Sequence, residues 1–400
     1  MADPVKVRVS GPLLACAHGV AREMLWAGYS PHTVRDYLYV LARLSRWLDD
    51  EGLATGQLTA EVVQRFLLAR RNAGNRRWCT VRSMQPMLTV LRDMRVIPVV
   101  AQPSPVSAVE AVLVAYRRYL MVERRLAAAS VITRVGVARR FLPRLTVDDE
   151  LRFDQLTPAA VSGFVLDQSR RYRPASMKVL TVALRCLVRF LFLTGVIDRD
   201  LSAAVLAVAH RAARLPQGVD DATLAALLNS CERSTAVGLR DHAILTLLIR
   251  LGLRAGEVAA LRLDDVDWRT GELVIHGKGN RLDRLPLPHD VGAVLVDYLR
   301  RRPRSTCRAL FLRACGPHGP ITAHSVTMVP RTASARAGLA VVGAHRLRHS
   351  AATGMLRSGA PLPEIAQALR HHAEASTARY AAVDRAALDT VARAWPGDRR

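Results

Sequence analysis

Apolar residues recur every three or four positions over most of the chain, a spacing that predicts amphipathic helices. The segment 33–52 shows the pattern most clearly, because one helical face collects Val34, Leu38, Leu41, Leu44 and Leu48. A second helix is predicted to begin at Thr59, a residue type that caps helix N-termini. A third covers 80–97, although Pro86 strains it. These segments predict a first helical domain over residues 1–98.

Prolines at positions 98, 103 and 105 break regular structure, so residues 99–108 are predicted to be a linker. The next block, 109–205, repeats features of the first. Residues 57–67 resemble 155–165, and residues 87–97 resemble 183–197. This order of segments favours an internal duplication of a small helical unit. The alternative, that two helical bundles share such features without a common origin, remains open.

The remaining block, 206–400, contains both the helical spacing of apolar residues and the alternation of apolar and polar residues that is typical of β-strands. A strongly apolar helix is predicted to open at Asp241. Residues 271–288 alternate apolar and polar positions around the turn Gly277–Asn280, which predicts a β-hairpin. The segments after the hairpin are predicted to be mostly helical. The expected fold class is therefore mainly α with a small β-hairpin or sheet (α+β).

Charge narrows the class of partner. The 400 residues include 58 Lys and Arg against 34 Asp and Glu, a formal net charge of +24. Such an excess points to a polyanion, either a nucleic acid or an anionic membrane surface. No apolar run has spanning length and the N-terminus does not resemble a signal peptide. We therefore expect a cytoplasmic, nucleoid-associated protein that binds nucleic acid and no membrane.

The six cysteines are scattered and form no CxxC pair, so neither a zinc site nor a disulfide framework is indicated.

The basic residues are unusual in composition, because only Lys6, Lys178 and Lys278 are lysines. The other basic residues are arginines, which a GC-rich coding bias alone would explain. Each lysine is therefore a candidate for a role that arginine cannot fill.

The densest group of candidate chemical residues is His345–His349, at the predicted start of a helix. His345 and Arg348 lie three positions apart and would share one helical face, with His349 beside them. A guanidinium matches phosphate oxygens, an imidazole moves protons near neutral pH, and a helix N-terminus attracts anions. The combination favours a phosphoryl centre, although a solvated basic helix start would look the same in isolation.

Five further candidate residues accompany this group. Arg254 follows the apolar helix, and Glu257 at i+3 is placed to hold its guanidinium. Lys278 lies at the predicted hairpin tip, and His371 precedes Tyr380 by nine residues. Each alone would be unremarkable in an arginine-rich protein. In this order within one block, they form a specific set.

With this set, residues 210–390 resemble the catalytic domain of tyrosine recombinases, the phage-integrase and Xer-like family. The matching positions are Arg254 in GLRAGE, Lys278 in GKGN, His345 and Arg348 in HRLRH, His371 in LRHH and Tyr380 in ARY. The second block, and less surely the first, is similar to that family's helical, SAM-like core-binding domain.

The resemblance implies a DNA strand-transfer reaction. Tyr380 would attack a phosphodiester, form a 3′-phosphotyrosyl link and free a 5′-hydroxyl. Arg254 and Arg348 would clamp the non-bridging oxygens, and His371 would donate a hydrogen bond to the phosphate. His345 would accept or relay the tyrosine proton, and Lys278 would protonate the leaving oxygen, which a guanidinium barely does. The bond energy is conserved, so we expect no metal and no cofactor.

The chain departs from the family pattern in two places. Arg370 stands where the family usually has a glycine that ends a helix, and a non-glycine residue is disfavoured in a left-handed cap. His372 follows His371, so which imidazole faces the phosphate stays open, with the spacing to Tyr380 favouring His371. The chain also begins with helical segments, so we do not expect the small β-rich arm-binding domain of many phage integrases.

The leading hypothesis is a site-specific recombinase of the integrase or transposase type, acting on double-stranded DNA as a homotetramer on synapsed sites. An apolar face in the tail would dock on a neighbouring subunit or pack on its own domain. Two alternatives remain: a type IB topoisomerase-like enzyme, and an inactive DNA-binding partner of a recombinase. The target sequence, the need for accessory proteins and the biological role are open, the role being transposition, phage integration, dimer resolution or cassette exchange.

Overall fold

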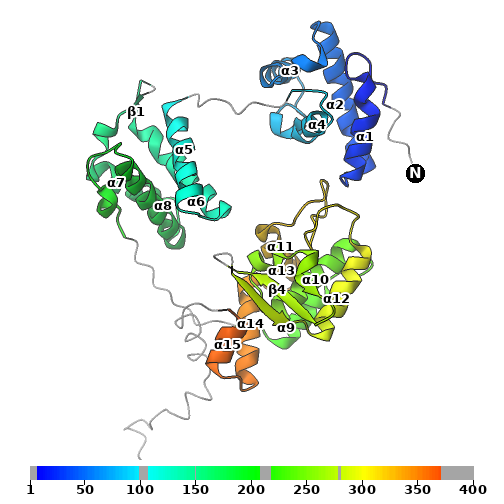
Figure 1. Cartoon of the computed structure of the whole chain (residues 1–400), viewed down its shortest axis with the longest axis vertical. Coiled ribbons are helices and arrows are strands. Elements are labelled where there is room, and N and C mark those ends of the chain that lie inside the picture. Colours follow the sequence, from blue (N-terminus) through cyan, green and yellow to red (C-terminus); the bar gives the residue numbers. More distant parts are fainter. Residues whose placement is uncertain (1–6, 99–106, 149, 208–217, 278–280, 371–400) are drawn as a thin grey trace, which may run out of the picture. The chain divides into compact units, whose positions relative to one another are not determined.

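A computed structural model describes residues 7–98, 107–148, 150–207, 218–277 and 281–370 (Figure 1). The described chain is mostly helical and carries two small antiparallel sheets, which confirms the α-rich α+β prediction. It separates into two compact units. One contains residues 7–98 together with 218–370, and the other contains residues 107–207. Each unit is described on its own below.

The first stretch, residues 7–98, is a four-helix bundle around its own apolar core. Its helices are α1 (Ala17–Trp26), α2 (Pro31–Asp50), α3 (Ala60–Asn72) and α4 (Val81–Asp93). The predicted cap at Thr59 forms, because its hydroxyl accepts the Val62 N–H. The Ser30 hydroxyl caps α2 in the same way by accepting the Thr33 N–H. Helix α4 runs through Pro86, as the sequence predicted.

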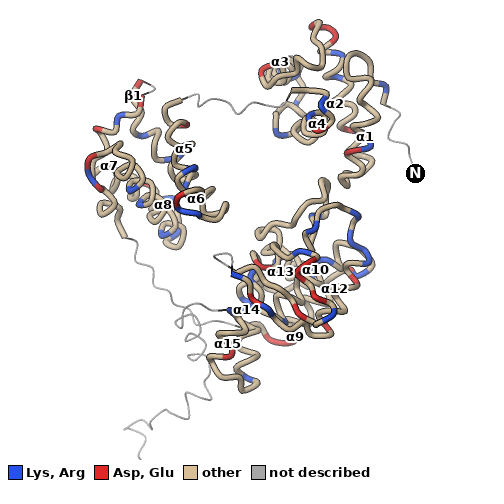
Figure 2. The backbone as a smooth tube through the Cα atoms, viewed as in Figure 1, with Lys and Arg blue, Asp and Glu red and all other residues tan. Residues whose placement is uncertain are grey.

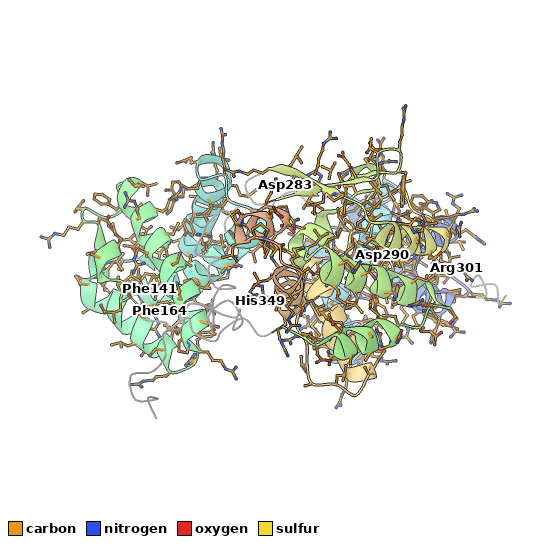
Figure 3. All side chains as sticks on the ribbon, turned by 90° about the horizontal axis from the view of Figure 1, so that it is seen from below. Phe141, Phe164, Asp283, Asp290, Arg301 and His349 are labelled. Atoms are coloured by element: carbon orange, nitrogen blue, oxygen red, sulfur yellow. The ribbon has the colours of Figure 1, made fainter. Side chains whose placement is uncertain are left out.

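Residues 107–207 form a second helical bundle with a separate core. Its elements are α5 (Ala108–Arg118), α6 (Ala128–Phe141), β1 (Thr146–Val147), β2 (Glu150–Leu151), α7 (Pro158–Ser169) and α8 (Pro174–Leu193). The rings of Phe141 and Phe164 meet edge to face at 5.1 Å in the middle of this core (Figure 3). The short strands pair Thr146 with Leu151.

The two bundles share local details at matching positions. Thr59 caps α3 and Thr157 caps α7 through the same hydroxyl-to-N–H bond, 98 positions apart. After the last helix of each bundle, Arg95 at φ +57° and Gly195 at φ +70° take the same left-handed conformation. These correspondences agree with the internal duplication that the sequence suggested.

Residues 218–370 carry a third core, built around α10 (Ala236–Arg250). The other helices are α9 (Asp221–Asn229), α11 (Ala255–Ala260), α12 (His289–Arg301), α13 (Ala323–Arg336), α14 (Ala344–Arg357) and α15 (Leu362–Ala368). Helix α10 packs against α12, α13 and α14, and its buried middle includes Ile244, Leu245, Leu247 and Leu248. This packing places the C-terminal end of α10 beside α14.

The predicted β-hairpin forms from β4 (Glu272–His276) and β5 (Leu282–Pro286), in the register that pairs His276 with Leu282. A third strand, β3 (Val266–Asp267), pairs with β4 on its other edge, so the sheet order is β3-β4-β5. The extra strand has only two residues, too few for an alternating pattern to reveal.

The predicted start of the apolar helix at Asp241 is wrong. Helix α10 begins at Ala236, and the Thr235 hydroxyl caps it by accepting the Gly238 N–H. Asp241 is buried within the helix, where its carboxylate pairs with Arg240 at 2.7 Å and Arg336 at 3.8 Å. Paired charges make its burial tolerable, so an acidic residue that usually marks a helix start lies inside one.

Candidate active site

Arg254 lies at the junction between α10 and α11. It is the N-cap residue of α11, with an extended backbone at φ −75° and ψ 149°. Its own N–H donates to Glu257 Oε2 at 2.8 Å, and its Nη1 donates to Glu257 Oε1 at 2.5 Å. The contact that the i+3 spacing predicted therefore forms. The Arg254 side chain keeps 40% of its surface exposed, whereas Glu257 keeps 5%, so the arginine reaches solvent from a buried anchor.

Arg348 is on the first turns of α14 and is buried, with 3% of its surface exposed. Its Nη1 donates to the Gly252 carbonyl at 2.5 Å, and its Nη2 donates to the Leu369 carbonyl. Gly252 has φ +56°, a left-handed conformation that favours glycine. A β-carbon there would meet Leu369 Cδ2 at 2.7 Å, so the tight approach of these segments also requires glycine.

One turn holds both arginines. The Leu369 carbonyl accepts from Arg348, and the next carbonyl, that of Arg370, accepts from Arg254 Nη2 at 3.1 Å. Arg254 and Arg348 lie 94 positions apart in the sequence, yet adjacent main-chain oxygens fix both guanidiniums. The structure therefore brings these two predicted residues together.

His345 lies at the start of α14, as predicted, and is exposed. Its ring meets that of His349, one turn further on, with ring centroids 4.3 Å apart and planes at 68° (Figure 3 labels His349). The three other predicted residues, Lys278, His371 and Tyr380, lie outside the described residues. The strands β4 and β5 that flank Lys278 in the sequence are described above.

Glu257 has a second cationic partner that the sequence did not reveal. Arg370 is buried, with φ +54°, and its Nη2 donates to Glu257 Oε2 at 2.9 Å. Burial raises the pKa of the Glu257 carboxyl, but the hydrogen bond from the Arg254 N–H and the charges of Arg370 and Arg254 outweigh burial and hold the pKa below its usual value. The carboxylate is therefore ionised at neutral pH. The one signal was arginine standing at a position where glycine was expected.

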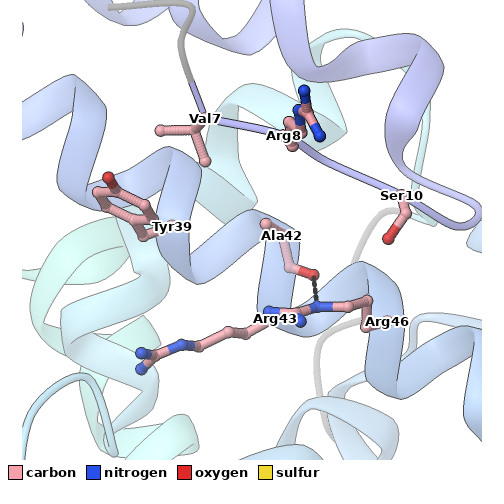
Figure 4. Close-up of a pocket in the computed structure, with 7 residues that line it drawn as sticks. All are labelled: Val7, Arg8, Ser10, Tyr39, Ala42, Arg43 and Arg46. Carbon is pink, nitrogen blue, oxygen red and sulfur yellow. Dashed lines mark hydrogen bonds between the residues drawn. The ribbon is translucent and has the colours of Figure 1, made fainter.

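A basic pocket lies on the first bundle, away from these residues in the sequence. It is open, has a volume of about 670 Å³, and is lined by Val7, Arg8, Ser10, Tyr39, Ala42, Arg43 and Arg46 (Figure 4). The described residues lining it include three arginines and no carboxylate. Arg46 Nε donates to the Ala42 carbonyl at 3.4 Å. Such a pocket suits an anion.

Basic side chains also occur on every bundle of the described chain (Figure 2). Over its described residues the chain has no helix long and apolar enough to cross a membrane. Within the same residues, no group of three His, Cys, Asp or Glu side chains is arranged to hold a metal ion.

Comparison with known proteins identifies the class. Residues 219–386 match the model of the phage integrase family, and residues 23–94 match the N-terminal SAM-like domain of phage integrases. A putative integrase/recombinase, y4rA of Sinorhizobium fredii (strain NBRC 101917 / NGR234), is 35% identical over 97% of this chain and 96% of its own length. Tyrosine recombinase XerC of Shewanella amazonensis is 31% identical over 67% of this chain and 90% of its own length.

Solved structures agree in fold. XerH recombinase bound to a palindromic difH substrate, in a post-cleavage complex, has a TM-score of 0.52 and 16% identity over 98% of each chain. A lambda integrase tetramer bound to a Holliday junction has a TM-score of 0.52 and 15% identity, over 81% of this chain and 90% of its own.

The chain therefore belongs to the tyrosine recombinase (phage integrase) family. It is a site-specific recombinase, an enzyme that cleaves and rejoins DNA strands.

Proposed function

We propose that Tyr380 is the nucleophile of this recombinase and that Arg254 and Arg348 clamp the phosphate it attacks. The observation that carries the proposal is the shared anchoring of the two guanidiniums by the carbonyls of residues 369 and 370. That turn directly precedes His371 in the sequence and lies ten residues before Tyr380. The two guanidiniums, held close together, supply positive charge where negative charge develops on the pentacoordinate phosphorane.

The reaction balances without an external energy source. The Tyr380 hydroxyl gives its proton to His345 and forms a bond to phosphorus, and the bond from phosphorus to the 5′-oxygen breaks. Lys278 gives a proton to that oxygen, and His371 donates a hydrogen bond to the phosphate. A 5′-hydroxyl from a second duplex then gives its proton to Lys278 and attacks the phosphotyrosine, which restores a phosphodiester; the bond from phosphorus to Tyr380 breaks, and Tyr380 takes its proton back from His345. Glu257 supports the site by holding Arg254.

The partner is double-stranded DNA that carries specific sites, bound by a homotetramer on synapsed duplexes. Three separate apolar cores support a division into helical domains at 1–98 and 109–205, a linker at 99–108 and a catalytic domain at 206–400. The similar fold of lambda integrase, which was solved as a tetramer bound to a Holliday junction, supports the assembly. The protein would act in the cytoplasm on nucleoid DNA.

Tyr380→Phe tests the nucleophile. It removes one hydroxyl and no charge, so duplex binding should match that of the wild type while covalent adducts disappear. Nicked suicide substrates trap the adduct, and a denaturing gel separates it from free protein. Tyr172→Phe, in the second bundle, is the matched control and should leave adduct formation unchanged. Adducts that persist in Tyr380→Phe would show that another residue attacks.

A further inference from the structure

Arg370 departs from the residue expected at its position in both backbone and side chain. Its φ of +54° lies in the left-handed region, which a β-carbon disfavours. Its side chain is nevertheless 3% exposed, so it is packed inside the site rather than extended into solvent. A buried guanidinium in a strained backbone position is retained only where the surroundings fix it.

The surroundings of the Arg370 guanidinium are specific. Its Nη2 donates to Glu257 Oε2 at 2.9 Å, and its Nη1 donates to the Ala368 carbonyl at 2.9 Å. Its Nε has no hydrogen-bond acceptor among the described residues. Glu257 is thus the one carboxylate that balances this buried charge within the described part of the chain.

Glu257 is shared between two arginines. Its Oε1 accepts from Arg254 Nη1, and its Oε2 accepts from the Arg254 N–H and from Arg370 Nη2. With Arg254 alone, the pair would carry no net charge. With Arg370, two cations face one anion, and the cluster keeps a net charge of +1 beside the buried Arg348. An anionic phosphate is attracted to that surplus charge.

Arg370 also acts through its main chain, because its carbonyl accepts from Arg254 Nη2 at 3.1 Å. The guanidinium of Arg254 is therefore held from two sides, by Glu257 and by the carbonyl of the residue that holds Glu257. Losing the Arg370 side chain would loosen the first contact while leaving the second in place.

We propose that Arg370 is a positioning residue for strand cleavage: its guanidinium clamps Glu257, offsets the charge of that carboxylate and so keeps Arg254 oriented and available to the phosphate. The proposal rests on the function proposed above for Arg254 and Tyr380.

A consequence is a distinct pH dependence. Glu257 is faced by Arg254 from the cap of its own helix and by Arg370 from the turn after α15. Among the described residues, the other charged groups of α10, α13 and β4, which also pack against α11, form no ion pair with it. Removing Arg370 takes away one of the charges that lower the pKa of the Glu257 carboxyl, while burial continues to raise it. The pKa of this carboxyl therefore rises. Protonation would then release Arg254 at a higher pH, and cleavage would begin to fall earlier on acidification.

The test compares full-length Arg370→Gly, Arg370→Lys and Glu257→Gln. Glycine accepts the left-handed backbone and removes the guanidinium, whereas lysine retains a positive charge. Single-turnover cleavage of a suicide substrate is followed from acid to neutral pH, with duplex affinity measured by gel shift and folding by thermal melting. Arg95→Gly is the matched control, because Arg95 has a similar φ of +57° but is exposed in the first bundle.

We expect Arg370→Gly to bind duplex normally, to cleave about tenfold or more slowly at neutral pH, and to lose activity at a higher pH than the wild type. Arg370→Lys should recover part of the rate and the wild-type acid limb. In a Glu257→Gln background, Arg370→Gly should cause no further shift of the acid limb, because the titrating group is gone. Arg95→Gly should cleave like the wild type.

A wild-type rate and acid limb in Arg370→Gly would overturn the proposal, as would a loss that is equal at all pH values and is not relieved by lysine. If Arg370→Gly melts below the assay temperature, Arg370→Lys and Arg370→Gln decide in the same way, because they differ in charge at similar length. Absence of Tyr380-dependent adducts in the wild type would instead refute the proposed function. Tyr380-dependent adducts with an unaffected Arg370→Gly would refute only this inference.

Discussion

At the scale of single residues, the site depends on positions that carry no reactive group. Gly252 illustrates this, because its carbonyl accepts from Arg348 while its backbone lies in the left-handed region. Two residues later the chain reaches Arg254. A side chain at 252 would collide with Leu369, whose carbonyl holds the other side of Arg348. The position of Arg348 therefore depends on the close packing of Gly252 against Leu369, two residues that take no part in the chemistry.

We expect Gly252→Ala to reduce both stability and cleavage. The left-handed backbone alone costs roughly 1 kcal/mol for alanine, and the 2.7 Å approach to Leu369 Cδ2 adds displacement of the turn that anchors Arg348. Melting temperature and single-turnover cleavage measure the two effects.

Gly354→Ala is the control on α14, because a β-carbon there meets nothing within 4 Å. It should be neutral or more stable by up to about 1 kcal/mol, as expected inside a helix. Equal behaviour of Gly252→Ala and Gly354→Ala would mean that close packing at 252 does not matter.

At the scale of elements, the two helical bundles give a matched pair of turns. Arg95 and Gly195 both follow the final helix of a bundle and both have positive φ, but only one is glycine. Both are exposed, and a β-carbon at 195 meets nothing within 4 Å. Backbone conformation is therefore the main property that a substitution changes.

We predict opposite signs for the reciprocal exchanges. Gly195→Ala should destabilise the chain by about 1 kcal/mol, because alanine is disfavoured at positive φ. Arg95→Gly should stabilise it by a few tenths of a kcal/mol, since relief of strain exceeds the added entropy of the unfolded chain. Urea unfolding of the full chain measures both. A change of the same sign at both sites would contradict the shared conformation.

Elements with a local signal were predictable from the sequence. The caps at Thr59 and Thr157, the β4–β5 hairpin and the Arg254–Glu257 contact each depend on residues a few positions apart. The start of α10 was misplaced because Asp241 is buried between two arginines, Arg240 and Arg336, and the second of these is distant in sequence.

The ion pair between Arg370 and Glu257 spans 113 positions, so no periodicity could reveal it. The sequence did single out residue 370 as a departure from its family, which was the right place to look. The sequence could not identify Glu257 as the partner of Arg370, because this contact depends on how α11 packs against the turn after α15.

At the scale of the whole molecule, the net charge of +24 favours electrostatic binding of the enzyme to the DNA backbone. Phosphate contacts give affinity that falls steeply with salt and carries little sequence information. We expect the pocket lined by Arg8, Arg43 and Arg46 on the first bundle to make such contacts, with the exposed Tyr39 also lining it.

We predict that Arg43→Gln combined with Arg46→Gln weakens duplex binding about equally for all sequences. The slope of log affinity against log salt concentration should become shallower by about 2, because each removed guanidinium leaves roughly one phosphate without a protein cation. Fluorescence anisotropy at several salt concentrations measures the slope. Arg65→Gln, whose guanidinium pairs with Glu51 on the same bundle, is the control and should leave the slope nearly unchanged. An unaltered slope in the double variant would exclude this pocket from the DNA interface.

The turn at residues 369 and 370 has one more consequence. The two carbonyls that accept from Arg348 and Arg254 belong to successive peptide planes. The orientation of one plane relative to the other is set by φ and ψ of a single residue, Arg370. If that residue adopted a negative φ, the two oxygens would change their orientation relative to each other, and the turn could no longer accept from both arginines at once. Substitutions that keep the left-handed conformation, such as glycine, would therefore preserve both main-chain anchors, whereas residues that favour negative φ would weaken both together.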